Sequence, residues 1–268
     1  MEQHRTIAID GHNVHYRIEG QGPQTLVLLH GFLQSLDIWT PYVLTYMHHM
    51  RVVTIDLPGH GQSQCLAEVH TMELMARTVK TVLDHAGVNQ CVMVGHSMGG
   101  YVASEFAHLY PYTLRGLGLV SSHVLPDTPE HRESRQAACR QVMENRASYI
   151  VGYIPNLFLP ANRTALSQDI DDLCGQCLET HAEAIVAAQQ GMMQRHPRID
   201  VLQHLEVPIL FIYGKHDPRI QLDLALAQAA EARHAEILLL EGAAHMPLME
   251  QREYVKPRIR NFVDTCYY

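Results

Sequence analysis

The chain has 268 residues, which corresponds to one or two domains and is long enough to bury a sizeable core. Apolar residues make up 47% and charged residues 18%, and no stretch reaches the roughly 18 consecutive apolar residues of a spanning helix, so we expect a folded protein without a membrane span. Because 20 basic residues stand against 28 acidic ones, we expect no basic surface for nucleic acid.

The N-terminal segment MEQHRT is polar from its first residue and lacks the apolar core of a signal peptide. We therefore expect a cytoplasmic protein. In that compartment the six cysteines are expected to be buried small hydrophobic residues or metal ligands rather than disulfides.

Short apolar runs alternate with longer helical patterns over the first half of the chain. Segments 6–9 and 14–18 are joined through Asp10 and Gly11, a dipeptide typical of two-residue hairpins, and are predicted to form an antiparallel pair at a sheet edge. Four buried strands are predicted at 26–29, 52–55, 91–94 and 117–120, with helices between them at about 35–48, 69–86 and 98–110. This alternation predicts an α/β fold with a mostly parallel, twisted sheet flanked by helices.

The alternation stops after residue 123, and residues 124–198 have helical periodicity without a convincing strand. A strand at 208–213, a last strand at 236–240 and a helix at about 248–265 then complete the pattern. We therefore predict one core, formed by 1–123 and 199–268, with 124–198 as a helical insertion.

The most informative stretch is CVMVGHSMGG at 91–100, a buried strand that runs through G-x-S-x-G into a helical pattern. A sharp strand-to-helix turn exposes the serine hydroxyl, and the small residues Gly95 and Gly99 let neighbouring backbone approach that turn. Ser97 is the predicted nucleophile, because a strand before and a helix after the motif favour this role over a structural turn serine.

With this motif the chain resembles the α/β-hydrolase family over nearly its whole length. LHGF at 29–32 lies where that family places its oxyanion loop, so the resemblance implies the backbone N–H groups of Phe32 and Met98 as oxyanion donors. DLPGHGQS at 56–63 resembles a loop of the family's lidded members. We expect His30 and His60 to organise these loops rather than to take part in catalysis.

A serine hydroxyl needs a general base and a group that fixes the base's tautomer, and the family order is serine, acid, histidine. Asp217 directly follows the strand at 208–213, and His245 follows the last strand, so these two are the predicted acid and base. His216 and His234 are the nearest competitors among 19 histidines, but neither lies in the loop after the last strand. Asp127, after an earlier strand, is the alternative acid.

The insertion resembles the helical cap of lidded hydrolases, which shapes the pocket. Predicted substrate-contacting residues are Phe32, His123, Leu157, Phe158, Met192 and Met246. Four cap arginines, Arg132, Arg135, Arg140 and Arg146, alternate with glutamates, a pattern typical of a solvated helix face.

Cys174, Cys177 and His181 could place three metal ligands along one helix face. No fourth ligand is identifiable and the resembled family uses no metal, so we expect no metal site and no cofactor. Inert cap cysteines are the favoured interpretation.

The sequence therefore predicts a serine carboxylesterase that acts on a small or medium ester through an acyl-enzyme on Ser97. A serine nucleophile argues against the related dehalogenases and epoxide hydrolases, which need a carboxylate there. The alternatives left open are a carbon–carbon bond hydrolase, an enol-lactonase and a small-molecule receptor that retains the triad. The sequence does not predict the oligomeric state.

Overall fold

The computed structural model describes residues 3–268, which form an eight-stranded sheet in the order β1-β2-β4-β3-β5-β6-β7-β8. The strands are β1 (Gln3–Ile9), β2 (His12–Glu19), β3 (Thr25–Leu29), β4 (Arg51–Ile55), β5 (Cys91–His96), β6 (Leu114–Val120), β7 (Ile209–Gly214) and β8 (Ala235–Leu240). Strands β3 to β8 run parallel to one another, so the predicted mostly parallel sheet is confirmed.

The predicted hairpin forms the antiparallel edge of the sheet. Asp10 and Gly11 connect β1 to β2 with φ angles of 49° and 83°, the pair of positive values that a tight two-residue hairpin turn requires. β2 also pairs antiparallel with β4, and this joins the hairpin to the parallel part of the sheet.

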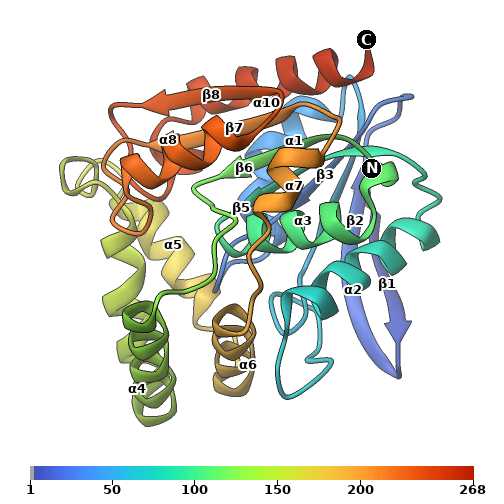
Figure 1. Ribbon diagram of the computed structural model, residues 1–268. Coiled ribbons are helices and arrows are strands. Elements are labelled where there is room, and N and C mark those ends of the chain that lie inside the picture. Colours follow the sequence, from blue (N-terminus) through green and yellow to red (C-terminus); the bar gives the residue numbers. More distant parts are fainter. Residues whose placement is uncertain (1–2) are drawn as a thin grey trace.

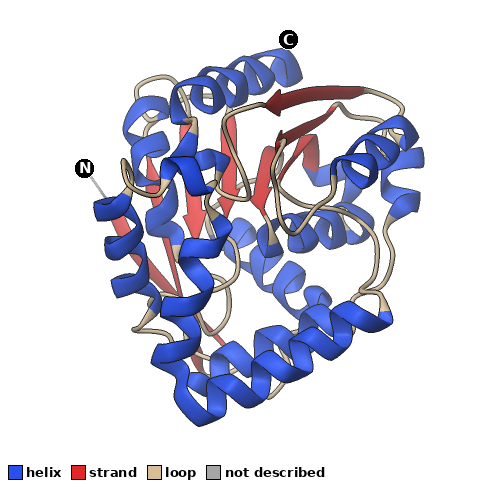
Figure 2. Ribbon diagram, turned by 90° about the vertical axis from the view of Figure 1, so that its left-hand side faces the viewer, coloured by secondary structure: helices blue, strands red, loops and turns tan. Residues whose placement is uncertain are grey.

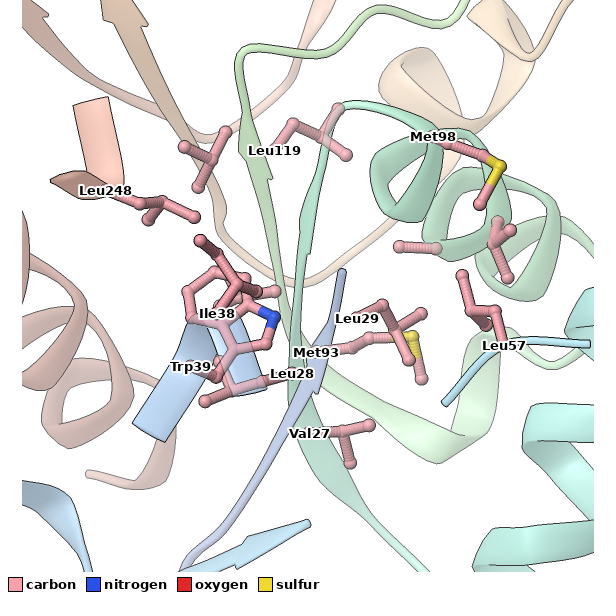
Figure 3. Close-up of a cluster of buried hydrophobic side chains, with 14 of the residues drawn as sticks. Val27, Leu28, Leu29, Ile38, Trp39, Leu57, Met93, Met98, Leu119 and Leu248 are labelled. Carbon is pink, nitrogen blue, oxygen red and sulfur yellow. The ribbon is translucent and has the colours of Figure 1, made fainter. Parts of the chain in front are cut away.

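The central strands are buried along their whole length because helices cover both faces of the sheet. Successive side chains of a strand point to opposite faces. In Figure 3, Trp39 and Leu248 accordingly lie on one side of β3, whereas Met98 and Leu57 lie on the other.

Two helical layers follow from the contacts between elements (Figure 1). One layer contains α2 (Met72–His85), α3 (Met98–Leu109), α7 (Ile199–His204) and α8 (Leu222–Glu231), each of which packs on the next. The other contains α1 (Thr40–Tyr46), α9 (Pro247–Glu250) and α10 (Arg252–Tyr267). The hydroxyl groups of Tyr42 and Tyr46 tie α1 to this C-terminal pair by donating to the Leu248 and Lys256 carbonyls at 2.9 and 2.8 Å.

Four helical segments differ from the expected pattern. The helix predicted over 35–48 is a short 3₁₀ turn, η1 (Leu36–Trp39), followed by α1. The helix predicted over 248–265 is divided into α9 and α10 at Gln251, whose φ and ψ of −136° and 50° are not helical. Helices α7 and α8 were not predicted.

The segment between β6 and β7 contains no strand within its described residues. Its elements are α4 (Pro129–Tyr153), η3 (Ile154–Leu157), η4 (Pro160–Asn162), α5 (Ser167–Cys177) and α6 (Ala182–Met193), followed by α7. The long α4 is prominent in Figure 2. The Arg198 N–H donates to the Val124 carbonyl at 2.7 Å, and the Arg198 guanidinium binds Glu105 of α3 through two contacts of 2.7 and 2.8 Å, so both ends of residues 124–198 are fixed together on the core.

The strand order reverses at β3, which lies between β4 and β5. In open parallel sheets such a reversal leaves a crevice beyond the carboxyl ends of the strands. The loops after β3 and β5 both begin there. No helix within residues 3–268 combines the length and the apolar character needed to cross a bilayer.

Candidate active site

Ser97 lies on the turn between β5 and α3 with φ 50° and ψ −115°, a conformation that non-glycine residues rarely adopt. A Cβ atom on Gly99 would lie 2.5 Å from the carbonyl oxygens of Leu29 and His30, and one on Gly95 would overlap Gly99. The turn therefore needs glycine at both motif positions, and its tight geometry leaves the Ser97 side chain facing a cavity.

The three side chains predicted to act together are in hydrogen-bond contact. His245 Nε2 lies 2.9 Å from Ser97 Oγ, and His245 Nδ1 lies 2.8 and 3.0 Å from the two carboxylate oxygens of Asp217. A carboxylate accepts only, so Nδ1 carries the proton and Nε2 is free to accept the hydroxyl hydrogen of Ser97. This is the tautomer that a general base requires.

Asp217 is held as an anion. Burial alone would raise its pKa, but His245 and the backbone N–H groups of Arg219 and Ile220, which donate at 2.7 and 3.1 Å, hold the pKa of this carboxyl below its usual value. The turn after β7 thus supplies the donors that keep the carboxylate charged and oriented toward His245.

Asp127, the alternative acid, has different partners. Its two oxygens accept from Arg135 Nε and Arg195 Nη1, each at 2.7 Å. Although burial alone would raise it, the pKa of Asp127 is lowered by these two guanidinium groups. The carboxylate that contacts His245 is therefore that of Asp217.

The loop that carries His245 is held from both sides. Glu250 Oε2 accepts from the backbone N–H groups of Ala244 and Met246 at 2.8 and 3.3 Å. The His245 N–H donates to the Leu157 carbonyl at 2.9 Å, and His96 Nε2 donates to the His245 carbonyl at the same distance. Sequence reasoning missed Glu250, for which the one available signal was its place in the turn that follows His245.

The two expected oxyanion donors are available. Neither the Phe32 nor the Met98 backbone N–H has an acceptor among residues 3–268, and Met98 begins α3, where the first N–H groups of a helix have no partner within it. Unpaired N–H groups beside a nucleophile can stabilise developing negative charge on a substrate oxygen.

His30 and His60 organise loops, as predicted. His30 Nε2 accepts from the Leu57 N–H at 2.9 Å, while His30 Nδ1 donates to the Gly31 carbonyl at 2.8 Å. His60 Nδ1 lies 3.1 Å from the Pro58 carbonyl. Burial lowers the pKa of His60 to about 3, so its ring is neutral.

The cavity above Ser97 has a more polar lining than the sequence suggested. Of the predicted substrate-contacting residues, Phe32, His123 and Met192 line it. Leu157, Phe158 and Met246 do not; these three side chains are buried in the hydrophobic core. The apolar character of Leu157 and Phe158 reflects the packing of the insertion on the core, and that of Met246 reflects the packing of the loop after β8, rather than contact with the cavity.

Several polar residues that sequence reasoning missed line the same cavity: Tyr101, Tyr149, Tyr153, Gln189 and Arg219. Arg135 also lines it, and this corrects the interpretation of the four cap arginines as one solvated face. Arg132 and Arg140 are exposed, but Arg146 donates to the Leu178 and Thr180 carbonyls. The charge pattern of α4 did not distinguish the arginines that face inward.

Cys174 and Cys177 are buried free thiols whose pKa is raised by burial, to about 12 for Cys177. His181 lies at the start of α6. No group of three or more His, Cys, Asp or Glu side chains within residues 3–268 is arranged to hold a metal ion.

The strand-to-helix serine turn, the order of acid and histidine after later strands, and the parallel sheet define the class of the protein. Residues 26–256 match the profile of the alpha/beta hydrolase family, and the chain belongs to this family. Among its relatives and structural neighbours are hydrolases of this fold, including esterases, and the protein is an α/β-hydrolase.

The similarity to individual relatives is moderate, with sequence identities of 28–30% for the three that follow. The chain is 29% identical over 272 residues to the dihydrolipoyllysine-residue acetyltransferase component of the acetoin cleaving system of Pseudomonas putida, covering 92% of this chain but 65% of that protein. It is 28% identical over 256 residues to the pimeloyl-[acyl-carrier protein] methyl ester esterase of Yersinia enterocolitica, covering 93% and 96%. A solved thermophilic esterase from Thermogutta terrifontis, with malate bound, superposes with a TM-score of 0.92 at 30% identity, covering 99% of this chain and all of that one.

Proposed function

We propose that the protein is a serine carboxylesterase in which Ser97 is the nucleophile, His245 the general base and Asp217 the residue that orients the base. The observation that carries this proposal is the continuous hydrogen-bonded series from the Asp217 carboxylate through the His245 ring to Ser97 Oγ. The similarity to two esterases, one by sequence and one by structure, supports ester hydrolysis.

In the acylation step His245 Nε2 accepts the Ser97 proton while Oγ attacks the ester carbonyl carbon. The carbonyl oxygen becomes an oxyanion, which the Phe32 and Met98 N–H groups bind. When the tetrahedral intermediate collapses, the bond to the alcohol oxygen breaks and the imidazolium returns its proton to that oxygen. The alcohol leaves, and the acyl group stays on Ser97.

Deacylation repeats the sequence with water. His245 takes a proton from the water molecule as its oxygen attacks the acyl-enzyme, and the same two N–H groups bind the second oxyanion. Release of Ser97 Oγ, which recovers its proton from the imidazolium, yields the free acid. The two steps consume one water per ester and need no cofactor.

Residues 124–198 are proposed to form a cap over this site, with the core formed by 1–123 and 199–268. Two features support this division. The Arg198 N–H donates to the Val124 carbonyl at the neck of the insertion, and helices α4 and α6 supply Arg135, Tyr149 and Met192 to the lining of the cavity that contains Ser97. The cap would determine which substrates reach the nucleophile.

The proposal is tested with para-nitrophenyl esters of increasing acyl length, using wild type and Ser97→Ala. We expect multiple turnovers by the wild type and a loss of about 10⁶-fold in kcat in the variant, as for removal of the nucleophile of other triads. Retained turnover in Ser97→Ala would refute the assignment.

The same panel separates the alternatives. A carbon–carbon bond hydrolase would act faster on a vinylogous diketone than on any aryl ester. An enol-lactonase would prefer an enol-lactone. A receptor would release less than one equivalent of nitrophenol per chain in a single slow phase.

A further inference from the structure

Two guanidinium groups enter the cavity above Ser97 from different parts of the chain: Arg135 from α4 and Arg219 from the turn after β7. They have different environments. Arg135 is half-buried within a hydrogen-bond network, whereas Arg219 is exposed at the cavity wall. The whole chain carries a net charge of −8, so a cationic wall in this cavity opposes the overall charge of the protein.

The charge of this wall is not cancelled by its neighbours. Asp127 is the one acidic side chain among the described residues that line the cavity, and it is shared by Arg135 and the buried Arg195. Two guanidinium groups on one carboxylate leave one positive charge. Asp217 lies behind His245 and forms its contacts with that ring and with backbone N–H groups.

Arg219 adds a second positive charge. Its guanidinium lies 4.8 Å from the centre of the Tyr153 ring, in a cation–π contact. Among residues 3–268 it donates no hydrogen bond from its side chain and forms no ion pair with a carboxylate. A planar fork of five N–H donors is therefore available to a bound molecule.

Stacked tyrosines connect the two guanidinium groups. Tyr149 and Tyr153 stack with ring centres 5.5 Å apart. Gln189 accepts from Arg135 Nη1 at 2.9 Å and donates to the Tyr149 hydroxyl at 3.2 Å, so Arg135 is joined to one ring while Arg219 covers the other.

The positively charged wall is close to the proposed reaction centre. Tyr153 contacts the ring of Phe32 edge-on, with 6.1 Å between ring centres, and the backbone N–H of Phe32 is a proposed oxyanion donor. The backbone of Arg219 is also fixed, because its backbone N–H donates to Asp217 Oδ1 at 2.7 Å. Ser97, Tyr153 and Arg219 line the same cavity, so a molecule whose ester lies at Ser97 has room to extend past Tyr153 toward the Arg219 guanidinium.

From this arrangement we infer that the preferred substrates carry a carboxylate remote from the scissile ester, and that Arg219, with Arg135 behind the tyrosine pair, binds this carboxylate. The inference rests on the proposed ester hydrolysis and adds the substrate class. A guanidinium pairs with a carboxylate through two parallel hydrogen bonds, which gives orientation as well as affinity.

The test compares two substrates that differ only in the remote carboxylate: para-nitrophenyl hydrogen adipate and para-nitrophenyl hexanoate. For wild type we expect kcat/KM for the adipate to exceed that for the hexanoate by about tenfold or more, after subtraction of the uncatalysed rate. In Arg219→Gln this ratio should fall to about one, and Arg219→Lys should restore part of it because the charge returns without the fork.

A second pair of substrates places the carboxylate on the alcohol side: the hexanoate ester of para-hydroxybenzoic acid and that of its methyl ester. A preference for the charged ester in the first pair alone will show that the acyl side faces Arg219, and a preference in the second pair alone will show that the alcohol side does. Arg132→Gln is the matched control, since it removes the same charge from an exposed position on α4 that does not line the cavity, and both ratios should stay at the wild-type value.

Salt provides an independent readout. Raising the ionic strength screens the attraction, so KM should rise for the charged substrate and stay constant for the neutral one. If Arg219 only packs on Tyr153, Arg219→Gln should change kcat/KM equally for the charged and the neutral substrate, and KM for the two substrates should depend on salt in the same way. Equal ratios in wild type and Arg219→Gln for both pairs would overturn the inference.

The outcomes separate the inference from the proposed function. Ser97-dependent hydrolysis of neutral esters without any charge preference would support the esterase and overturn the carboxylate subsite. If wild type hydrolyses no ester, the proposed function fails, and calorimetric titration of wild type with adipate and adipamide decides the subsite alone. If Arg219→Gln binds adipate more weakly than wild type does, the carboxylate subsite is supported. If wild type binds adipate and adipamide equally, the carboxylate subsite is overturned.

Discussion

Replacing Asp217 by asparagine tests the proposed base more sharply than removing it. In Asp217→Asn, the side-chain oxygen is expected to stay where Oδ1 now accepts the Arg219 and Ile220 N–H groups, because those donors are fixed in the turn. The new amide NH₂ then faces His245 Nδ1, which now lies 2.8 Å from Oδ2. An NH₂ group only donates there, so Nδ1 must accept and the ring proton must move to Nε2.

With the proton on Nε2, His245 cannot accept the hydrogen of Ser97, although the heavy atoms stay in place. Loss of the correct tautomer lowers kcat by about 10⁴-fold in such triads, which is a barrier increase of about 5 kcal/mol. We expect this loss in steady-state hydrolysis of a para-nitrophenyl ester, with KM changed little.

Asp127→Asn is the matched control, since it makes the same chemical change in an aspartate that lines the same cavity. Its carboxylate contacts Arg135 and Arg195 rather than His245, so kcat for a neutral ester should fall by less than about tenfold. A kcat within tenfold of wild type in Asp217→Asn, or a loss of about 10⁴-fold in Asp127→Asn instead, would refute the assignment of the acid.

Three further predictions concern stability and the supports of the site. Gly99→Ala should lower the free energy of unfolding by about 1–3 kcal/mol, because its methyl group would meet the Leu29 and His30 carbonyls. Gly175→Ala, at a helical position with open space around it, should raise the free energy of unfolding by up to about 1 kcal/mol. Equal effects of the two substitutions in urea denaturation would contradict the packing argument. Glu250→Gln should place an NH₂ group opposite a backbone N–H that now donates to the carboxylate. This should lower the free energy of unfolding by about 1–3 kcal/mol and also lower kcat, whereas the exposed Glu253→Gln should change neither quantity. Burial lowers the pKa of His60, His96 and His123 to about 3 and that of His70 to about 4. Below about pH 6.5 the unfolded chain therefore binds protons that the native state does not, and the free energy of unfolding should fall by about 1.4 kcal/mol per pH unit for each such histidine; a constant value between about pH 7 and 5 would contradict this.

The features that the sequence predicted best are those fixed by local chemistry. The strands around 26–29 and 91–94 are continuous apolar runs because both faces of the sheet are covered, and their short length between turn residues favoured a strand over a buried helix. The G-x-S-x-G turn could be recognised because the backbone packs so closely around Ser97 that only glycine fits at positions 95 and 99.

The helices were harder to predict. Helix α8 has no side-chain cap at Gln221, and the break at Gln251 has no glycine or proline at or directly beside it that would mark a boundary. Such boundaries are set by packing on the sheet rather than by the segment itself.

The cavity lining was predicted only in part because it depends on how the insertion folds back. Leu157 and Phe158 are apolar, as a substrate pocket would allow, but their side chains are buried in the core. Tyr153 and Arg219 are far apart in the sequence and form their cation–π contact only in the folded chain. A residue type therefore indicates that a side chain will be buried, but not which neighbour it will face.

The central claim is that Ser97 is the nucleophile of an acyl-enzyme, and covalent labelling tests it most directly. Wild type treated with a fluorophosphonate should gain the mass of one phosphonyl group, located by peptide mass spectrometry on Ser97, in parallel with loss of ester hydrolysis. Ser97→Ala should gain no mass. A phosphonyl group on another residue, or full inactivation without modification of Ser97, would contradict the account.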